Sequence, residues 1–259
     1  MITSTGNQQV KNVTALMKRA KERKKQRCFV AEGERMCMET PGELLKDLYV
    51  SESYLSDHER QLEGYPYTVV SDRVFSAMSD TRTPQGILAV AAMPEYREDD
   101  LLSDSGAHLL VLESIQDPGN LGTMIRTGEG AGVTGVIMNG TTADLFAPKT
   151  VRATMGSIFR VPYLIAEELE ETVRGFGRRG VAFYGAHLEG TVEYDEPDYR
   201  RPCGFLIGNE GGGLTKELSA CAKELVRIPM CGRVESLNAA VSAALFMYEC
   251  SRQRRRDNK

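Results

Sequence analysis

From residue 107 onward, short apolar runs alternate with amphipathic segments, and this alternation restricts the chain to few architectures. The first run, AHLLVLESI, is apolar through its middle, which is typical of a strand buried on both faces. Strands that alternate with helices imply a mainly parallel sheet covered on both faces. We therefore expect an α/β domain over 107–259. Its expected strands are 107–115, 133–140, 160–165, 181–190 and 225–230, and 203–214 is expected to be a strand that runs into a loop. Helices are expected between these strands, with a final helix from 236 to about 255.

A weaker alternation of the same kind fills residues 1–93, which we expect to form a smaller α/β domain. Its first helix is basic and amphipathic. The residues on the apolar side of that helix recur at helical spacing: Val10, Val13, Leu16, Met17 and Ala20. The polar segment PEYREDDLLSDSG, residues 94–106, has little periodicity and is expected to be a linker.

The composition is that of an ordinary globular protein, with 41% hydrophobic and 26% charged residues. No apolar run approaches the length of a membrane span, and the N-terminus, MITSTGNQQVKNV, has no apolar signal core. The six cysteines form no CxxC pair, so we expect reduced thiols in a cytoplasmic protein. None of the three histidines lies near two cysteines, which argues against a zinc site, and no metal is expected.

The charge distribution says more about partners than the net charge does. A net charge of −4 argues against nucleic acid, but residues 10–27 hold eight Lys or Arg and a single acid, Glu22. The last residues, SRQRRRDNK, are basic again. A local basic patch favours binding to a phosphate backbone, and a solvated helix face with a frayed tail is the alternative. The candidate phosphate-binding residues in the first helix are Lys18, Arg19, Arg23, Lys24 and Arg27.

The glycine-rich segments do not predict a nucleotide-binding protein. GAGVTG, residues 130–135, matches the dinucleotide fingerprint, but that fingerprint follows a strand and opens a helix. Here the order is reversed, and Gly130 and Gly132 are typical of a helix end. GNEGGG lacks the Lys-Ser/Thr of a phosphate-binding loop. Neither NAD nor ATP is supported.

Three polar stretches follow three expected strands of the C-terminal sheet. The first, DPGNLGTMIRTG, places Asn120 at a helix mouth and Arg126 on its flank. The second, LIGNEGGGL, sets Glu210 among glycines, which let a ligand approach the backbone. The third, IPMCGRVESLNAAVSAALF, places Ser236 and Asn238 before an apolar helix.

Each stretch alone also fits a helix cap or a solvated turn. Ligands of parallel sheets bind beyond the carboxyl ends of the strands, so the three stretches together predict a binding crevice. A fourth loop, FYGAHLEG, carries His187, which is more often incidental than a ligand contact.

These three stretches, in their order, resemble the three signature motifs of the SpoU family of RNA ribose 2′-O-methyltransferases, over about 107–250. NLGTMIR is similar to the first motif, IGNEGGGL to the second and IPMCGRVESLNAAVSAAL to the third. FVAEGERM and TPQGILAV resemble the substrate-binding domain that often precedes it, which is similar to ribosomal and kink-turn-binding proteins (L30e-like). In RATMGSIF, Thr154 stands where the family pattern has Ser, outside the three motifs.

The resemblance implies a trefoil-knot methyltransferase domain that binds S-adenosylmethionine and works as a homodimer through its C-terminal domain. The catalytic residues that it implies are Asn120, Arg126, Glu210, Ser236 and Asn238. The cofactor contacts that it implies are Ala186, Gly208, Glu210, Gly211, Ile228, Met230, Ser236, Leu237 and Ala239. Arg126 would also contact the RNA.

The implied reaction moves a methyl group from a sulfonium to a ribose hydroxyl of RNA, with ribosomal RNA of the 23S type favoured over transfer RNA. The family proposal makes Arg126 the base, but a guanidinium stays protonated, with a pKa above about 12. Arg126 orienting a phosphate, with phosphate or water taking the proton, is the alternative. A non-catalytic RNA-binding or ribosome-assembly protein and a dinucleotide-dependent α/β enzyme remain as rival functions.

Overall fold

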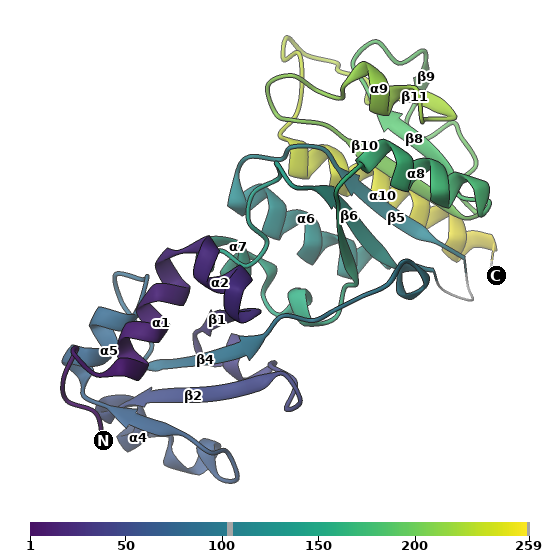
Figure 1. The fold of residues 1–259 in the computed structure, drawn as a ribbon. Coiled ribbons are helices and arrows are strands. Elements are labelled where there is room, and N and C mark those ends of the chain that lie inside the picture. Colours follow the sequence, from purple (N-terminus) through teal and green to yellow (C-terminus); the bar gives the residue numbers. More distant parts are fainter. Residues whose placement is uncertain (103–105, 258–259) are drawn as a thin grey trace. The chain divides into compact units, whose positions relative to one another are not determined.

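The computed structural model describes residues 1–102 and 106–257, which form two compact units (Figure 1). The first unit joins Met1–Glu95 with Asp144–Phe159, and the second joins Tyr96–Ala143 with Arg160–Lys259. The first unit is therefore built from two separate stretches of the sequence. No helix in the described part of the chain is long and apolar enough to cross a bilayer.

The first unit is organised around a four-stranded mixed sheet with the order β1-β4-β2-β3. Neighbours β1/β4 and β4/β2 are antiparallel, whereas β2/β3 are parallel. Its elements are α1 (Gln8–Lys18), α2 (Ala20–Gln26), β1 (Cys28–Glu32), α3 (Glu34–Met38), β2 (Leu45–Ser51), α4 (Glu52–His58), η1 (Glu59–Leu62), β3 (Thr68–Val70), α5 (Asp72–Met78) and β4 (Ile87–Ala92), with α7 (Pro148–Thr154) and η3 (Ser157–Phe159) from the second stretch.

The first helix forms where its apolar spacing predicted, but it is shorter than expected. Extended backbone at Arg19 (φ −127°, ψ 110°) ends α1 and starts α2, so the basic segment 10–27 is two helices. The buried side of α1 packs with α5 on the sheet, and the apolar core there includes Val13, Leu16 and Phe75 (Figure 1).

Residues 144–159 pack in the first unit, although the bounds expected from the sequence include them in the second domain. The ring of Phe29 on β1 lies 4.8 Å from the ring of Phe146 and 5.8 Å from that of Phe159. Asp144 pairs with Arg23 of α2 at 2.6 Å. Burial of these aromatic rings and of this ion pair couples the segment to the N-terminal stretch.

The second unit contains a seven-stranded sheet with the order β7-β6-β5-β10-β8-β11-β9, and every pair of neighbours is parallel. This confirms the predicted α/β class. The strands are β5 (His108–Leu112), β6 (Gly135–Asn139), β7 (Tyr163–Ala166), β8 (Ala182–Ala186), β9 (Val192–Glu193), β10 (Cys203–Ile207) and β11 (Glu224–Arg227). The two-residue strand β9 is an addition that the sequence did not predict.

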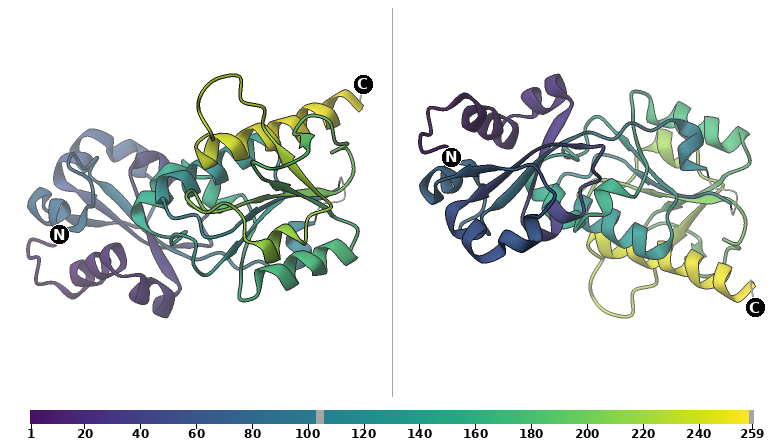
Figure 2. Two further views of the ribbon diagram at one scale, coloured as in Figure 1. Left: turned by 90° about the horizontal axis from the view of Figure 1, so that it is seen from above. Right: turned by 90° about the horizontal axis from the view of Figure 1, so that it is seen from below.

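Helices cover both faces of this sheet. On one face α6 (Pro118–Ala131) packs against α10 (Ala239–Asp257), and on the other lie α8 (Leu169–Arg178) and α9 (Lys216–Ser219). Figure 2 shows α10 in yellow and α8 in green on opposite sides of the sheet. As predicted, GAGVTG ends a helix and precedes a strand: Gly132 terminates α6 with a left-handed φ of 78°, and Gly135 starts β6.

The expected linker is partly packed. A short helix, η2 (Glu98–Leu101), follows the first unit, and the Leu101 side chain is completely buried in the core of the second. Gly135 makes room for it, because a Cβ at that position would lie 2.3 Å from the Leu101 side chain. Residues 103–105 of the expected linker lie outside the described residues.

Candidate active site

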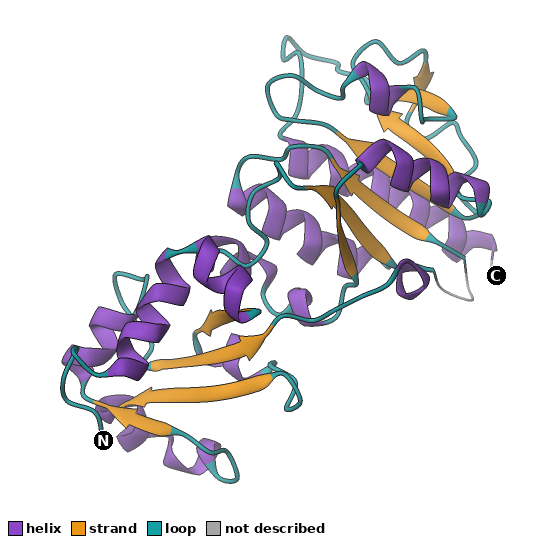
Figure 3. Cartoon of the chain, viewed as in Figure 1, coloured by secondary structure: helices purple, strands orange, loops and turns teal. Residues whose placement is uncertain are grey.

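The polar stretches predicted from the sequence all follow the carboxyl ends of strands, on one side of the sheet. Because all its strands are parallel, the loops after β5, β8, β10 and β11 begin on the same side (Figure 3). β10 is hydrogen-bonded to both β5 and β8. The first and second motifs are therefore direct neighbours, although they lie far apart in the sequence.

Glu210 is the point at which these two motifs meet. Its Oε1 accepts from Asn120 Nδ2 at 3.1 Å, and its Oε2 accepts from the Gln116 N–H at 3.1 Å. The Asp117 N–H adds a longer contact of 3.4 Å. Partial burial alone would raise the pKa of Glu210, but these hydrogen bonds from Asn120 and the backbone outweigh it and lower the pKa. Glu210 is therefore an anchored carboxylate anion and a weak base.

Asn120 can reach Glu210 because another residue caps its helix. Asn120 lies at the mouth of α6, where it was expected, but Asp117 takes the cap position and accepts from the Asn120 N–H at 2.9 Å. Pro118 follows at the start of the helix, where its missing N–H costs nothing. The Asn120 side chain can therefore form hydrogen bonds with residues of the loops beyond the sheet.

Asn238 combines the two roles considered for it. Its Oδ1 accepts from the Ala240 N–H at 2.9 Å and the Val241 N–H at 3.3 Å, which caps α10. Its Nδ2 donates to Asn120 Oδ1 at 3.0 Å. Asn238, Asn120 and Glu210 thus form one chain of side-chain hydrogen bonds drawn from all three motifs.

The other two candidate catalytic residues lie outside this chain of hydrogen bonds. Arg126 is exposed on α6, and Ser236 is exposed in the loop after β11. Within residues 1–102 and 106–257, no side-chain hydrogen bond or ion pair joins either one to the trio. Both side chains are exposed to solvent, and their roles in the site stay predictions.

Most candidate cofactor residues lie in the loops after β10 and β11, while Ala186 is the last residue of β8 and Ala239 the first of α10. The apolar members Ile228, Met230 and Leu237 are half-buried. Gly208 lies where the chain folds back on itself: a Cβ there would be 2.1 Å from the Gly213 carbonyl carbon. Open glycine backbone beside half-buried apolar side chains fits a cofactor held mainly by main chain and apolar contacts.

Comparison with known proteins identifies the family. Residues 107–248 match the SpoU rRNA Methylase family, and residues 7–89 match the MRM3-like substrate binding domain. The chain belongs to the SpoU rRNA methylase family. The family resemblance predicted from the three motifs is therefore confirmed.

Relatives of this SpoU protein match it over most of its length. It is 36% identical over 251 residues to the 23S rRNA (guanosine(2553)-2'-O)-methyltransferase RlmP of Bacillus subtilis, covering 95% of this chain and 97% of the relative. It is 33% identical to the 23S rRNA (guanosine-2'-O-)-methyltransferase RlmB of Bordetella pertussis, covering 82% and 91%. The crystal structure of an AdoMet-bound rRNA methyltransferase from Sinorhizobium meliloti superposes with a TM-score of 0.86 at 34% identity, covering 97% of each chain.

The structure changes the expected basic surface. Lys18, Arg19, Lys24 and Arg27 are exposed, and Arg27 pairs with Glu95 at 2.7 Å. Arg23 is only 5% exposed, donates to the Leu16 carbonyl at 2.6 Å and pairs with Asp144. The expectation that Arg23 binds RNA is therefore wrong, because its guanidinium is buried within the protein.

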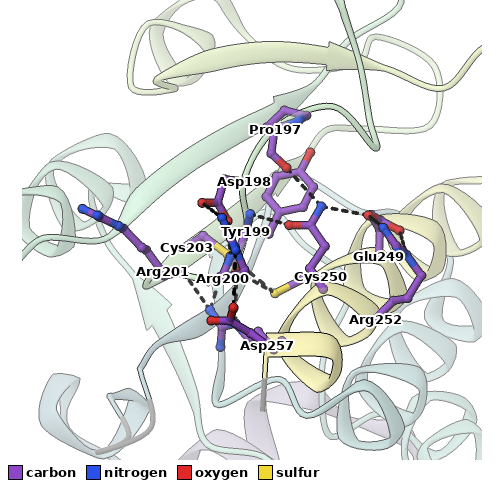
Figure 4. A network of polar contacts seen from close by, with 12 residues as sticks. Pro197, Asp198, Tyr199, Arg200, Arg201, Cys203, Glu249, Cys250, Arg252 and Asp257 are labelled. Carbon is purple, nitrogen blue, oxygen red and sulfur yellow. Dashed lines mark hydrogen bonds and ion pairs between the residues drawn. The ribbon is translucent and has the colours of Figure 1, made fainter. Parts of the chain in front are cut away.

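Several arginines of the basic C-terminal tail also form ion pairs or hydrogen bonds within the protein. It continues α10, in which Arg252 pairs with Glu249 at 2.6 Å. Arg254 donates to the Ala107 carbonyl at 2.8 Å and the Arg201 carbonyl at 2.9 Å. Figure 4 shows Arg200 between Asp198 and Asp257 in the same region. Arg254 stabilises the end of the sheet opposite the site, whereas Arg255 and Arg256 are exposed.

Sequence reasoning missed several residues that support the site. Asn209 Nδ2 donates to the Ser114 carbonyl at 2.8 Å, and Glu113 accepts two hydrogen bonds from Thr215. The sequence carries a signal for Glu113, because it is an acid placed directly after an otherwise apolar strand. Glu113 is 5% exposed, and a buried carboxylate requires a hydrogen-bond donor nearby.

Proposed function

We propose that this protein transfers a methyl group from S-adenosylmethionine to a ribose 2′-hydroxyl of ribosomal RNA, as a 23S-type methyltransferase. The observation that carries the proposal is the chain of hydrogen bonds from Asn238 through Asn120 to Glu210, at the carboxyl edge of a parallel sheet in a SpoU protein. RlmP and RlmB, which it resembles, are named as enzymes acting on guanosine of 23S rRNA.

The cofactor, when bound, supplies a methyl group already activated by its positive sulfur. The chain has two tasks: to hold the ribose hydroxyl in line with the methyl group and to let the hydroxyl proton leave. Fixed geometry of the reacting groups can lower the barrier by up to ~7–11 kcal/mol. We assign this positioning to Asn120, Glu210, Ser236 and Asn238.

Arg126 acts by its charge in this proposal. A guanidinium stays protonated, so we assign to Arg126 the orientation of a substrate phosphate and the stabilisation of the developing alkoxide. Glu210 is a poor base, because its hydrogen bonds lower its pKa. A phosphate oxygen or a water therefore takes the proton.

Arg126→Lys tests this assignment, because it keeps the charge but loses the two-pronged donor geometry. We expect about a 100-fold loss of methyl transfer into ribosomal RNA, while the affinity for S-adenosylmethionine, measured by calorimetry, barely changes. Arg178→Lys is the matched control, since Arg178 is an exposed arginine on α8 that pairs with Glu171. Near-wild-type turnover of Arg126→Lys would refute a special role for Arg126.

Calorimetry of the wild type tests the proposed cofactor. Binding of S-adenosylmethionine near one site per chain, with no binding of NAD, supports the proposal. Absence of both binding and methyl transfer would instead favour the rival RNA-binding or ribosome-assembly protein.

We also propose that the first unit selects the RNA site, through phosphate contacts by Lys18, Arg19, Lys24 and Arg27. The match of residues 7–89 to a substrate binding domain supports this. Phosphate contacts make binding salt-dependent, whereas structured RNA is selected by shape and unpaired bases. Homodimerisation through α10 is part of the same proposal, and the trefoil knot and the cytoplasmic location stay predictions.

A further inference from the structure

A second carboxylate lies beside the proposed active site and is not used in the reaction. Glu113 follows β5 directly and is only 5% exposed. Its Oε2 accepts from the Thr215 N–H at 2.8 Å, and its Oε1 accepts from Thr215 Oγ1 at 2.7 Å. Both oxygens of a buried carboxylate are thus committed to one residue, which makes this a strong, geometrically defined contact.

Thr215 is the residue at which the glycine loop of the second motif ends. Its Oγ1 donates to Glu113 and also accepts from the Leu218 N–H at 3.2 Å, which caps α9. Its neighbour Leu214 is buried in the core. Glu113 therefore holds the end of the loop against the end of β5.

The start of the loop is fixed as well, and Glu210 lies between the two fixed points. Asn209 and Gly213 exchange two backbone hydrogen bonds, of 3.1 and 2.9 Å. Asn209 Oδ1 accepts from the Gly211 N–H at 2.8 Å, and Asn209 Nδ2 donates to the Ser114 carbonyl. Four glycines give this loop little conformational preference of its own, so its shape depends on these side-chain contacts.

We propose that Glu113 is a positioning residue for the methyl-transfer reaction. It sets where the Glu210 carboxylate lies relative to Asn120, by holding Thr215 at the end of the glycine loop, and does not itself touch the RNA or the cofactor. The inference rests on the proposed function, and it adds a residue outside the three motifs to the machinery of that site. A displacement of about 1 Å at a reacting centre can cost about 100-fold in rate, so a buried contact of this kind controls turnover.

The test uses the full-length protein and the variants Glu113→Gln, Thr215→Val and Thr215→Ser. Glu113→Gln replaces one acceptor with a donor, and Thr215→Val removes the hydroxyl while keeping the shape. We expect both to lower kcat about 10-fold to 100-fold at saturating S-adenosylmethionine, with KM for RNA nearly unchanged. Thr215→Ser keeps both the backbone N–H and the hydroxyl that donate to Glu113, so it should retain most of the wild-type kcat.

A second comparison shows whether Glu113 acts through Glu210. In a Glu210→Gln background, adding Glu113→Gln should lower kcat little further, because residues that act as a unit are not additive. Independently of activity, hydrogen exchange of the amides of 208–214 should become faster in Glu113→Gln. Glu249→Gln is the control for the loss of a buried carboxylate: Glu249 is 8% exposed and pairs with Arg252 on α10. It should lower stability but leave kcat unchanged.

Three results would overturn the inference while leaving the proposed function intact. They are wild-type kcat in Glu113→Gln, a full additional loss in the Glu210→Gln background, or a loss of kcat no larger than that caused by Glu249→Gln. If the wild type transfers no methyl group to ribosomal RNA, the proposed function itself fails. In that case, faster exchange of 208–214 in Glu113→Gln would still show that Glu113 holds the loop.

Discussion

At the scale of single residues, burial changes the chemistry of His108. This side chain starts β5, is 1% exposed and lies edge-on to the ring of Phe205 at 5.8 Å. Its Nε2 has no hydrogen-bond partner in the described part of the chain. Burial, and then the positive charge of Arg254, lower the pKa of His108 to about 4, against the opposing effect of a backbone hydrogen bond at Gly132. His108 is therefore neutral in the folded protein at pH 7.

This shift predicts loss of stability in acid. An unfolded histidine has a pKa of about 6.5, so between about pH 6.5 and pH 4 the unfolded chain binds more protons than the folded one. The free energy of unfolding should therefore fall as the pH drops through this window, by at most about 3 kcal/mol. Urea denaturation at pH 7, 6 and 5 measures the slope. His108→Gln cannot titrate and should show a flatter profile, and an identical slope in both proteins would contradict the prediction.

At the scale of secondary structure, α10 has two sides with different roles. Asn238 caps its first turn, and residues such as Ala243, Phe246 and Met247 are buried against the rest of the unit. Val241 and Tyr248 are 48% and 44% exposed, and they lie two turns apart on the same side of the helix. Gly130 of α6 leaves room for Tyr248, since a Cβ there would be 3.0 Å from the Tyr248 hydroxyl.

The exposed apolar side of α10 is where we place the dimer contact. We expect the wild type to sediment as a dimer and Tyr248→Glu to sediment as a monomer, because a charge would have to be buried in the contact. Ile165→Glu is the matched control, as Ile165 is another exposed apolar residue, on the edge strand β7, with 53% exposure. Sedimentation velocity measures the result, and circular dichroism verifies that the helix is intact. A monomeric wild type would contradict the placement.

At the scale of the whole molecule, the first unit depends on residues from the middle of the sequence. The Arg23–Asp144 pair and the contacts of Phe29 with Phe146 and Phe159 join 144–159 to the N-terminal stretch. A protein that lacks 1–93 would expose these aromatic rings. The activity of the truncated protein would therefore reflect lost stability as well as lost RNA selection. Charge-reversing variants of Lys18 and Arg19 in the full-length protein are a better test of site selection.

Asp144→Ala measures this dependence. The substitution leaves the Arg23 guanidinium buried without its carboxylate, which typically costs about 3–5 kcal/mol. We expect hydrogen exchange to become faster in peptides of 1–95, whereas peptides of 160–257 keep their protection. Glu171→Ala is the control, because it breaks an ion pair whose side chains are both 67% exposed, and such pairs contribute little. Equal protection in wild type and Asp144→Ala would contradict the coupling.

The sequence by itself determined the features that depend on local pattern. Apolar periodicity predicted the strands and helices of the second unit, because the residues that make up such a pattern lie within a few positions of one another. The alternation of strands with helices then predicted a parallel sheet. The placement of three polar stretches after three strands predicted a shared crevice. The resemblance to the SpoU motifs implied that Asn120, Glu210 and Asn238 belong to it. The reversed order of helix and strand around Gly132 excluded a dinucleotide fingerprint.

Only the tertiary structure decided which side chains meet. The pairing of β10 with β5 brings Glu210 to Asn120, and Asp117 rather than Asn120 caps α6. The ion pair with Asp144 keeps Arg23 buried and out of the basic surface. Thr215 donates the hydrogen bonds that the buried Glu113 requires. In most of these cases the partner comes from a distant segment. A local pattern shows whether a side chain can donate or accept, whereas strand order and packing determine the partner it finds.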